Sequence, residues 1–184
     1  MKKLIETLEI QLIAPAQGYG VSVDNMLAEW GAVPYSQLSV LLVNLRFLSM
    51  IHQTHHWQAR GDSFYGDHLL YERLYNDTVN EIDAIAEKSV GLGTDQNVHL
   101  PLQVSQLMKL VQSYGMSSTI PNQSELARRS LVAEVGFLRC AEHVSCSLKE
   151  SGLMTNGLEN MLQAFCDVHE GHVYLLKKRC QRGV

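Results

Sequence analysis

Apolar residues recur every three or four positions along most of this chain, and that spacing places them on one face of an α-helix. The pattern is clear in residues 34–60, where the apolar stripe consists of Leu38, Leu42, Leu45 and Leu48. No segment shows the sustained alternation of apolar and polar residues that is typical of a β-strand. The sequence therefore predicts an all-α protein.

Glycine, proline and capping residues divide the periodic stretches into separate helices. Gly61 ends the first long helix, and "GLG" ends the second. A short helix beginning near Pro101 lies in the connection that follows. The predicted long helices cover residues 34–60, 63–92, 122–150 and 156–180. Four long helices with a short helix in the crossover between the second and third are the pattern of an up-down four-helix bundle.

The length of the chain sets the number of domains. With 184 residues it is long enough for one domain with a full core and too short for two. We expect the bundle to cover residues 34–180 and a short C-terminal tail to cover 181–184. Residues 1–33 are expected to form an N-terminal arm with a short helix at 23–30.

Charge and hydropathy limit the partners of the protein. A formal charge of −4 indicates that a polyanion is not the main partner. No apolar run approaches the roughly 18 residues that span a bilayer, and residues 1–16 carry acids where a signal peptide would be apolar. The four cysteines lack C-x-x-C spacing, which favours reduced thiols. We therefore expect a cytoplasmic protein without a membrane partner.

Histidines and carboxylates gather around the turn between the first two long helices. His56 closes the first helix and His68 opens the second. Glu72, Asp83 and Glu87 share a helix face with His68, beside the apolar stripe. Imidazoles and carboxylates are the ligands that a divalent metal such as iron or zinc prefers. The pattern predicts a metal site, and the open alternative is a solvated helix edge.

The second helix is too long for one ion to reach all of these side chains. His68 and Asp83 are fifteen residues apart, which is about 22 Å on a continuous helix. If the residues form one site, two antiparallel copies of the chain must supply its two halves. A two-fold axis would then build two such sites in each dimer.

The segment "HWQARGDSFYGDHLLYERLYNDTVNEIDAIAEKSVGLG" resembles the signature of the Dps family, ferritin-like mini-cage proteins named for DNA protection in starved cells. In that family a His-Trp pair, a Gly turn, a second His, an acid one turn later and a D-x-x-x-E pair follow one another. His56-Trp57, Gly61, His68, Glu72, Asp83 and Glu87 occupy the matching places. The resemblance is dense over residues 44–93 and implies a ferritin-like four-helix bundle.

The resemblance also implies a function and an assembly. It implies a ferroxidase that oxidises Fe²⁺ with hydrogen peroxide or dioxygen at a site between subunits, and stores ferric mineral in a hollow shell of twelve copies. The expected ligands, which are also the expected catalytic residues, are His56, His68, Glu72, Asp83 and Glu87, with Glu72 as the more labile ligand or the ligand of a second metal.

Three further residues lie within or next to this motif. The resemblance puts Trp57 beside the metal, where it could donate an electron or screen radicals, but a tryptophan at a helix end is as often simply packed. His52, one turn before His56, is either an accessory ligand or a buried, hydrogen-bonded side chain. The side chain of His55 is rotated about 100° around the helix from that of His56, and we expect it to be exposed.

The last helix and the chain ends bear on other functions. His169 and His172 are spaced to chelate a metal, although a solvated or interfacial cluster is the favoured interpretation. Ordinary ferritins place E-x-x-H pairs inside each bundle, and this chain has none, which argues against a di-iron centre within one chain and for a centre between subunits. The modest basic cluster at the C-terminus complements the helix dipole, so DNA binding is doubtful; it consists of Lys177, Lys178, Arg179 and Arg182.

Two alternatives to a ferroxidase follow from the same residues. One is a DNA-protecting shell without enzymatic activity, which the negative charge makes less favourable. The other is a helical-bundle metal protein of another kind, such as a zinc- or nickel-dependent hydrolase. That alternative requires His56, His68 and a histidine of the last helix to meet within one chain.

Overall fold

The computed structural model describes residues 22–114 and 121–181, and this part of the chain contains helices and no strand. The helices are α2 (Val23–Trp30), α3 (Ser36–Gln58), α4 (Phe64–Leu92), the 3₁₀ helix η1 (Asp95–Val98), α5 (Leu100–Ser113), α6 (Gln123–Glu150) and α7 (Asn156–Cys180). The predicted all-α class, the four long helices and the short crossover helix are confirmed. None of the helices within these ranges is long and apolar enough to cross a membrane.

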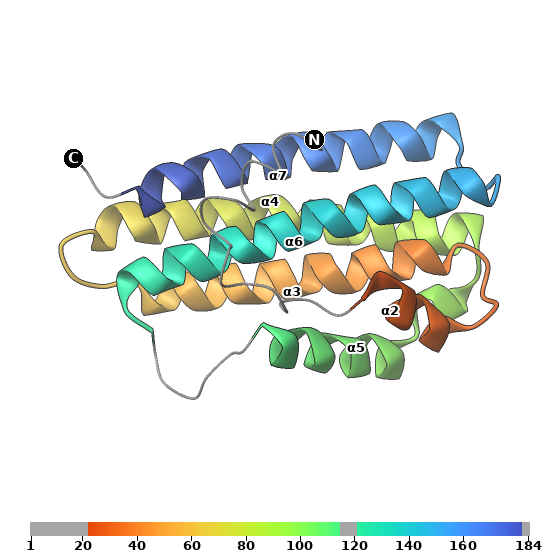
Figure 1. Cartoon of the computed structure of the whole chain (residues 1–184), viewed down its shortest axis with the longest axis horizontal. Coiled ribbons are helices and arrows are strands. Elements are labelled where there is room, and N and C mark those ends of the chain that lie inside the picture. The colour runs from red at the N-terminus through yellow and green to blue at the C-terminus, as the bar shows by residue number, and fades with distance from the viewer. Residues whose placement is uncertain (1–21, 115–120, 182–184) are drawn as a thin grey trace.

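The four long helices lie side by side, with α3 and α6 between the crossover helix α5 and the α4–α7 layer (Figure 1). Helix α3 packs against α2, α4, α5 and α6. Its residues from Leu38 to Leu45 are therefore all buried, polar Ser39 and Asn44 included. An amphipathic stripe is weak in such a helix because partners cover almost every side.

Specific residues begin and end the long helices. The Asn122 side chain accepts a hydrogen bond from the backbone N–H of Glu125 at 2.9 Å, which caps α6. Thr155 caps α7 in the same way through the N–H of Leu158. Gly61, with φ of 76°, lies in the turn between α3 and α4, where the left-handed conformation favours glycine. That turn brings the end of α3 next to the start of α4.

Helix α2 packs onto the bundle. Met26 and Trp30 are buried in the core. The Trp30 indole N–H donates to the Gln106 side chain at 3.1 Å, and the Gln106 amide donates to the Met26 carbonyl at 2.7 Å. The short helix expected at residues 23–30 is thus confirmed, and it is anchored on α5. The rest of the predicted arm, residues 1–21, lies outside the described residues.

We expect Gly136→Ala to destabilise the fold. Gly136 lies on α6, and a Cβ there would lie 2.0 Å from the Tyr114 hydroxyl oxygen and 3.3 Å from the ring carbon that bears it. Tyr114 is buried against Phe47, and its ring must shift within the hollow that it lines together with Gly136 to relieve this contact. Overpacking of this kind costs about 1–3 kcal/mol, which thermal unfolding at a fixed protein concentration would measure.

Tyr114→Phe provides the matched control because it removes only the hydroxyl group. In the double variant Gly136→Ala/Tyr114→Phe the closest clash is gone, and most of the stability lost by the single Gly136→Ala variant should return. If the double variant is as unstable as Gly136→Ala alone, the contact with Tyr114 is not the cause.

Candidate metal centres

The turn at Gly61 brings two of the predicted ligands together. The rings of His56 at the end of α3 and His68 in the first turns of α4 stack, with centroids 3.7 Å apart. His56 Nδ1 lies 2.9 Å from the backbone oxygen of His68, and His68 Nδ1 lies 3.2 Å from the backbone oxygen of His56. The two residues therefore hold each other in place.

These reciprocal contacts decide which ring nitrogen is free. A carbonyl oxygen can only accept a hydrogen bond, so each Nδ1 must carry the proton that it donates. In the neutral imidazole the lone pair is then on Nε2, and no partner of either Nε2 is found within the described ranges. Tyr75 packs against His56, and Phe64 packs against His68. The pair is thus oriented and can offer two nitrogen ligands.

An ion pair fixes the start of α4 beside His68. The Arg179 guanidinium of α7 donates to both carboxylate oxygens of Asp67, at 2.5 and 2.8 Å. It also donates to the Ser63 hydroxyl, which in turn donates to Asp67. Bidentate pairs of this kind are among the stronger hydrogen bonds. Arg179 is therefore engaged within the bundle, which leaves less of the C-terminal basic cluster for a nucleic acid.

The structure does not bring Asp83 and Glu87 to this pair. Asp83 and Glu87 are exposed one turn apart toward the far end of α4, whereas Glu72 is half-buried one turn after His68. Because α4 is one continuous helix, about 22 Å of helix axis separates His68 from Asp83. Trp57 is 69% exposed. Within one chain, the predicted residues form two separate half-sites.

A second group of ligand-type side chains lies inside the bundle, and the sequence analysis did not predict it as a site. Every long helix contributes to this buried cluster: its members are His52 of α3, Asp77 and Glu81 of α4, Glu134 of α6, and His169 and His172 of α7. The three imidazoles and Glu134 are completely buried. Imidazoles and carboxylates are rarely buried without specific partners.

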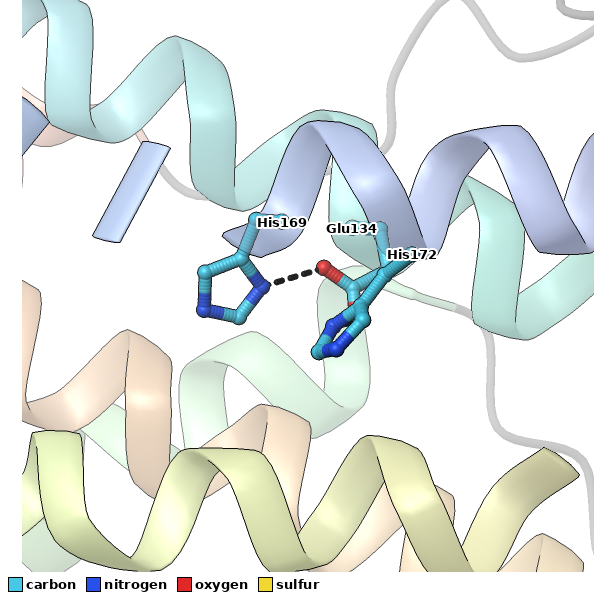
Figure 2. Close-up of side chains that lie close together, drawn as sticks. All are labelled: Glu134, His169 and His172. Atoms are coloured by element: carbon cyan, nitrogen blue, oxygen red, sulfur yellow. Dashed lines mark hydrogen bonds and ion pairs between the residues drawn. The ribbon is translucent and has the colours of Figure 1, made fainter. Parts of the chain in front are cut away.

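Glu134 lies at the centre of the buried cluster. Its Oε1 is 2.8 Å from His52 Nε2 and 3.1 Å from His172 Nδ1, and its Oε2 is 2.5 Å from His169 Nδ1. Figure 2 shows His169 and His172, one turn apart on α7, close to this carboxylate. One ligand atom from each of these three residues lies within 4.8 Å of the others, so together they could hold a metal ion.

The remaining nitrogens of the α7 pair contact carboxylates of α4. His169 Nε2 is 2.9 Å from Glu81 Oε2, and His172 Nε2 is 3.0 Å from Asp77 Oδ2. Each of these two imidazoles is therefore placed between a central carboxylate and an outer one. Asp77 and Glu81 are four residues apart, which puts them on the same face of α4.

Burial and charge set the protonation states in the buried cluster. Burial alone would raise the pKa of the Glu134 carboxyl, but the charge and hydrogen bonds of His169, with the hydrogen bonds of the other imidazoles, hold that pKa well below its usual range. Burial alone would lower the pKa of His169, which Glu134 and Glu81 nevertheless raise to about 10. Burial lowers the pKa of His52. Without a metal, His169 is therefore a cation between two carboxylates at neutral pH.

Two expectations about the other histidines need correction. His169 and His172 are not solvated or interfacial, because both are fully buried. His55 was expected to be exposed, but it is 2% exposed and its Nδ1 contacts the Ser130 hydroxyl at 2.8 Å. Burial lowers its pKa to about 3, so it is neutral. The expectation failed because other helices cover most of α3. A side chain rotated by about 100° from half-buried His56 therefore still contacts a neighbouring helix, here through Ser130 of α6.

The missing E-x-x-H pair argued against a di-iron centre within one chain, and it gave no indication of the ligand-type residues inside the bundle. Ligand-type residues do meet inside this bundle, but the α7 pair has H-x-x-H spacing and Glu134 comes from another helix. His52 was given two interpretations, and the buried, hydrogen-bonded one is confirmed. The histidine of α3 that shares Glu134 with the α7 pair is thus His52. Ligand-type residues thus meet within one chain, as the alternative function required, but His56 and His68 are not among them.

The helix order and the crossover define a ferritin-like four-helix bundle. DpsC from Streptomyces coelicolor has a similar structure, with a TM-score of 0.65 and 19% sequence identity over 82% of this chain and 86% of that chain. Dps from Thermosynechococcus elongatus also has a TM-score of 0.65, with 17% identity over 89% of this chain and 97% of that chain. No protein-family model matches the sequence, and a search of curated proteins finds no relative. The resemblance to Dps structures is confirmed at the level of the fold.

Proposed function

We propose that this chain is a Dps-type ferroxidase, which binds Fe²⁺ between two copies and stores the oxidised iron in a hollow shell. The ligands in this proposal are His56, His68 and Glu72 of one copy with Asp83 and Glu87 of the other. The observation that carries the proposal is the stacked His56–His68 pair, whose Nδ1 atoms are both used by backbone carbonyls and whose Nε2 atoms remain for a metal.

The surfaces around both half-sites support an interface there. Next to the histidine pair, four large side chains are strongly exposed: Trp57, Phe64, Tyr65 and Leu69. Near Asp83, an apolar hollow of about 190 Å³ is lined by residues that include Met50, Ile82, Leu100 and Val104. Gathered exposed apolar side chains and apolar hollows are features of interaction sites. A second, antiparallel copy would cover both surfaces and bring the two half-sites together.

The ligand set suits iron oxidation. Imidazoles bind Fe²⁺ without neutralising its charge, and carboxylates favour the Fe³⁺ product. In the proposed reaction two Fe²⁺ ions each give one electron to hydrogen peroxide, whose O–O bond breaks. The peroxide takes up two protons and leaves as two water molecules. Dioxygen is the alternative oxidant. Trp57, exposed beside the histidine pair, would be covered by the second copy and could donate an electron or screen radicals.

We expect His68→Ala to slow Fe²⁺ oxidation by at least about tenfold without loss of assembly. Even the loss of a residue that only supports a ligand weakens metal binding by about 10–100-fold, and His68 is half-buried outside the apolar core. Stopped-flow absorbance of ferric iron would measure the rate. The matched control is His99→Ala, because His99 is an exposed histidine before α5.

The mass of the particle in solution tests the shell. Twelve copies of a 20.6 kDa chain amount to about 250 kDa, and we expect light scattering to give this mass for the wild type and for His68→Ala. If the wild-type protein is a stable monomer and still oxidises Fe²⁺, the shared site is contradicted. An assembled His68→Ala variant with the rate of the His99→Ala control would also contradict it.

A further inference from the structure

We propose that Glu134, His169 and His172 bind one divalent transition-metal ion of the zinc and ferrous-iron class inside the bundle. This core metal site is separate from the surface site of the proposed ferroxidase and does not depend on it. Its ligands come from α6 and α7 of the same chain, and both histidines and the carboxylate are fully buried.

The donor atoms are already close to metal-binding positions. A tetrahedral ion with metal–ligand distances of about 2.0–2.1 Å holds its ligand atoms roughly 3.3 Å apart. The Glu134 oxygens lie 2.5 Å from His169 Nδ1 and 3.1 Å from His172 Nδ1, and one atom of each residue lies within 4.8 Å of the others. Side-chain rotations alone would therefore admit an ion. Two imidazoles and a carboxylate are a donor set suited to zinc and ferrous iron.

The surroundings of the two imidazoles are those of metal ligands. A metal-bound histidine usually donates its other ring N–H to a carboxylate, which fixes the ring and increases its basicity. His169 Nε2 meets Glu81 at 2.9 Å, and His172 Nε2 meets Asp77 at 3.0 Å. On the other side, His52 contacts Glu134 at 2.8 Å and orients its carboxylate. Each of the three ligands thus has its own supporting partner.

The charge inside the bundle also favours a cation. Three carboxylates, Asp77, Glu81 and Glu134, surround the α7 histidines, and two of them are buried. The ion pairs that Glu81 and Glu134 form in the described part of the chain are all with imidazoles. A buried carboxylate is costly unless it is paired or binds a metal. A divalent ion between the imidazoles would supply the positive charge without any Lys or Arg.

Complete burial indicates a structural role for the core metal ion. Closed sites hold ions that stabilise a fold, whereas sites that turn over substrate keep a position open to solvent. An ion here would connect α6 to α7 directly, and to α4 through the outer carboxylates. Since the ligands are not accessible to solvent, uptake should accompany folding or be slow.

The test measures zinc retained after folding. The chain is unfolded, stripped of metal with a chelator, refolded with Zn²⁺ and desalted, and zinc is counted by mass spectrometry. The background is His56→Ala/His68→Ala, which removes the two histidines of the surface site. We expect one zinc per chain in this background. Adding His169→Gln/His172→Gln should remove it, and adding His143→Gln, at an exposed histidine paired with Asp24, should not.

A milder variant covers the case in which the core double variant does not fold. Asp77→Asn removes the charge from the outer partner of His172, and the side chain of Asp77 is 38% exposed. We expect it to weaken Zn²⁺ binding by about 10–100-fold in competition with a coloured chelator. The control is Arg73→Gln, because Arg73 contacts Asp77 from the surface and not the imidazole.

Two results would overturn the core metal site. One is a background protein that folds and retains no zinc. The other is zinc binding that Asp77→Asn weakens no more than Arg73→Gln does. Neither result bears on the surface site, which iron oxidation measures independently. Conversely, a loss of oxidation in the background protein with one zinc retained would leave the core metal site intact.

Discussion

Mixing two inactive half-site variants should restore Fe²⁺ oxidation. One variant is His56→Ala/His68→Ala, and the other is Asp83→Ala/Glu87→Ala. If each site takes its two halves from two chains, a mixed dimer has one site with both halves mutated and one with both halves intact. Random pairing of equal amounts makes half of the dimers mixed. The activity of the mixture should therefore reach about a quarter of the wild-type activity, measured after the subunits are dissociated and reassembled.

The control for this experiment mixes two variants that are damaged in the same half-site. His56→Ala and His68→Ala, as separate single variants, leave no site with both halves intact in any pairing. Their mixture should stay as slow as each variant alone. Native mass spectrometry must show mixed dimers in both mixtures. If the complementary mixture contains mixed dimers and gains no activity, the two-chain geometry is wrong, because an intrachain site cannot be rescued by a partner.

The fold was largely predictable because the apolar spacing directly records which helix faces are buried. The predicted helices at 63–92, 122–150 and 156–180 agree closely with α4, α6 and α7. Gly61 and "GLG" were sufficient to divide the pattern, since the chain must turn there. The short helix at 23–30 was predicted as well, but its packing through Trp30 and Gln106 was not, because side-chain pairing between distant segments has no local signal.

The candidate sites were only partly predictable. The His56–His68 pair could be found because one tight turn joins its two helices. The buried cluster could not, because Glu134 is one of several acidic residues on a helix with many polar positions, and its partners are at least 35 residues away in sequence. The available signal was the H-x-x-H spacing of His169 and His172. This spacing indicates a buried site only if one knows that this face of α7 packs inside the bundle.

Glu134→Gln should destabilise the metal-free protein by up to about 3–5 kcal/mol, because it removes one of the two carboxylates that pair with the buried His169 cation and leaves Glu81 alone to compensate that charge. The amide keeps the shape of the carboxylate, so no cavity forms. Glu134 contacts three imidazoles, of which His169 carries the positive charge. Thermal unfolding in chelator, at a fixed concentration, should show a melting temperature roughly 10 °C lower. Glu142→Gln, half-buried on the same helix, should change stability by less than about 0.5 kcal/mol.

The pH dependence separates a charge effect from a packing effect. In the folded protein the pKa of His169 is raised from 6.5 to about 10. Its protonation therefore stabilises the fold fully below about pH 6.5, and this stabilisation is lost as the pH rises through about 10. Because Glu134 is the main cause of the raised pKa, the difference in unfolding free energy between wild type and Glu134→Gln should be largest near pH 6.5 and narrow toward pH 10. A difference that stays constant over this range would mean that Glu134 stabilises the bundle by shape and hydrogen bonding alone, and not through the charge of His169.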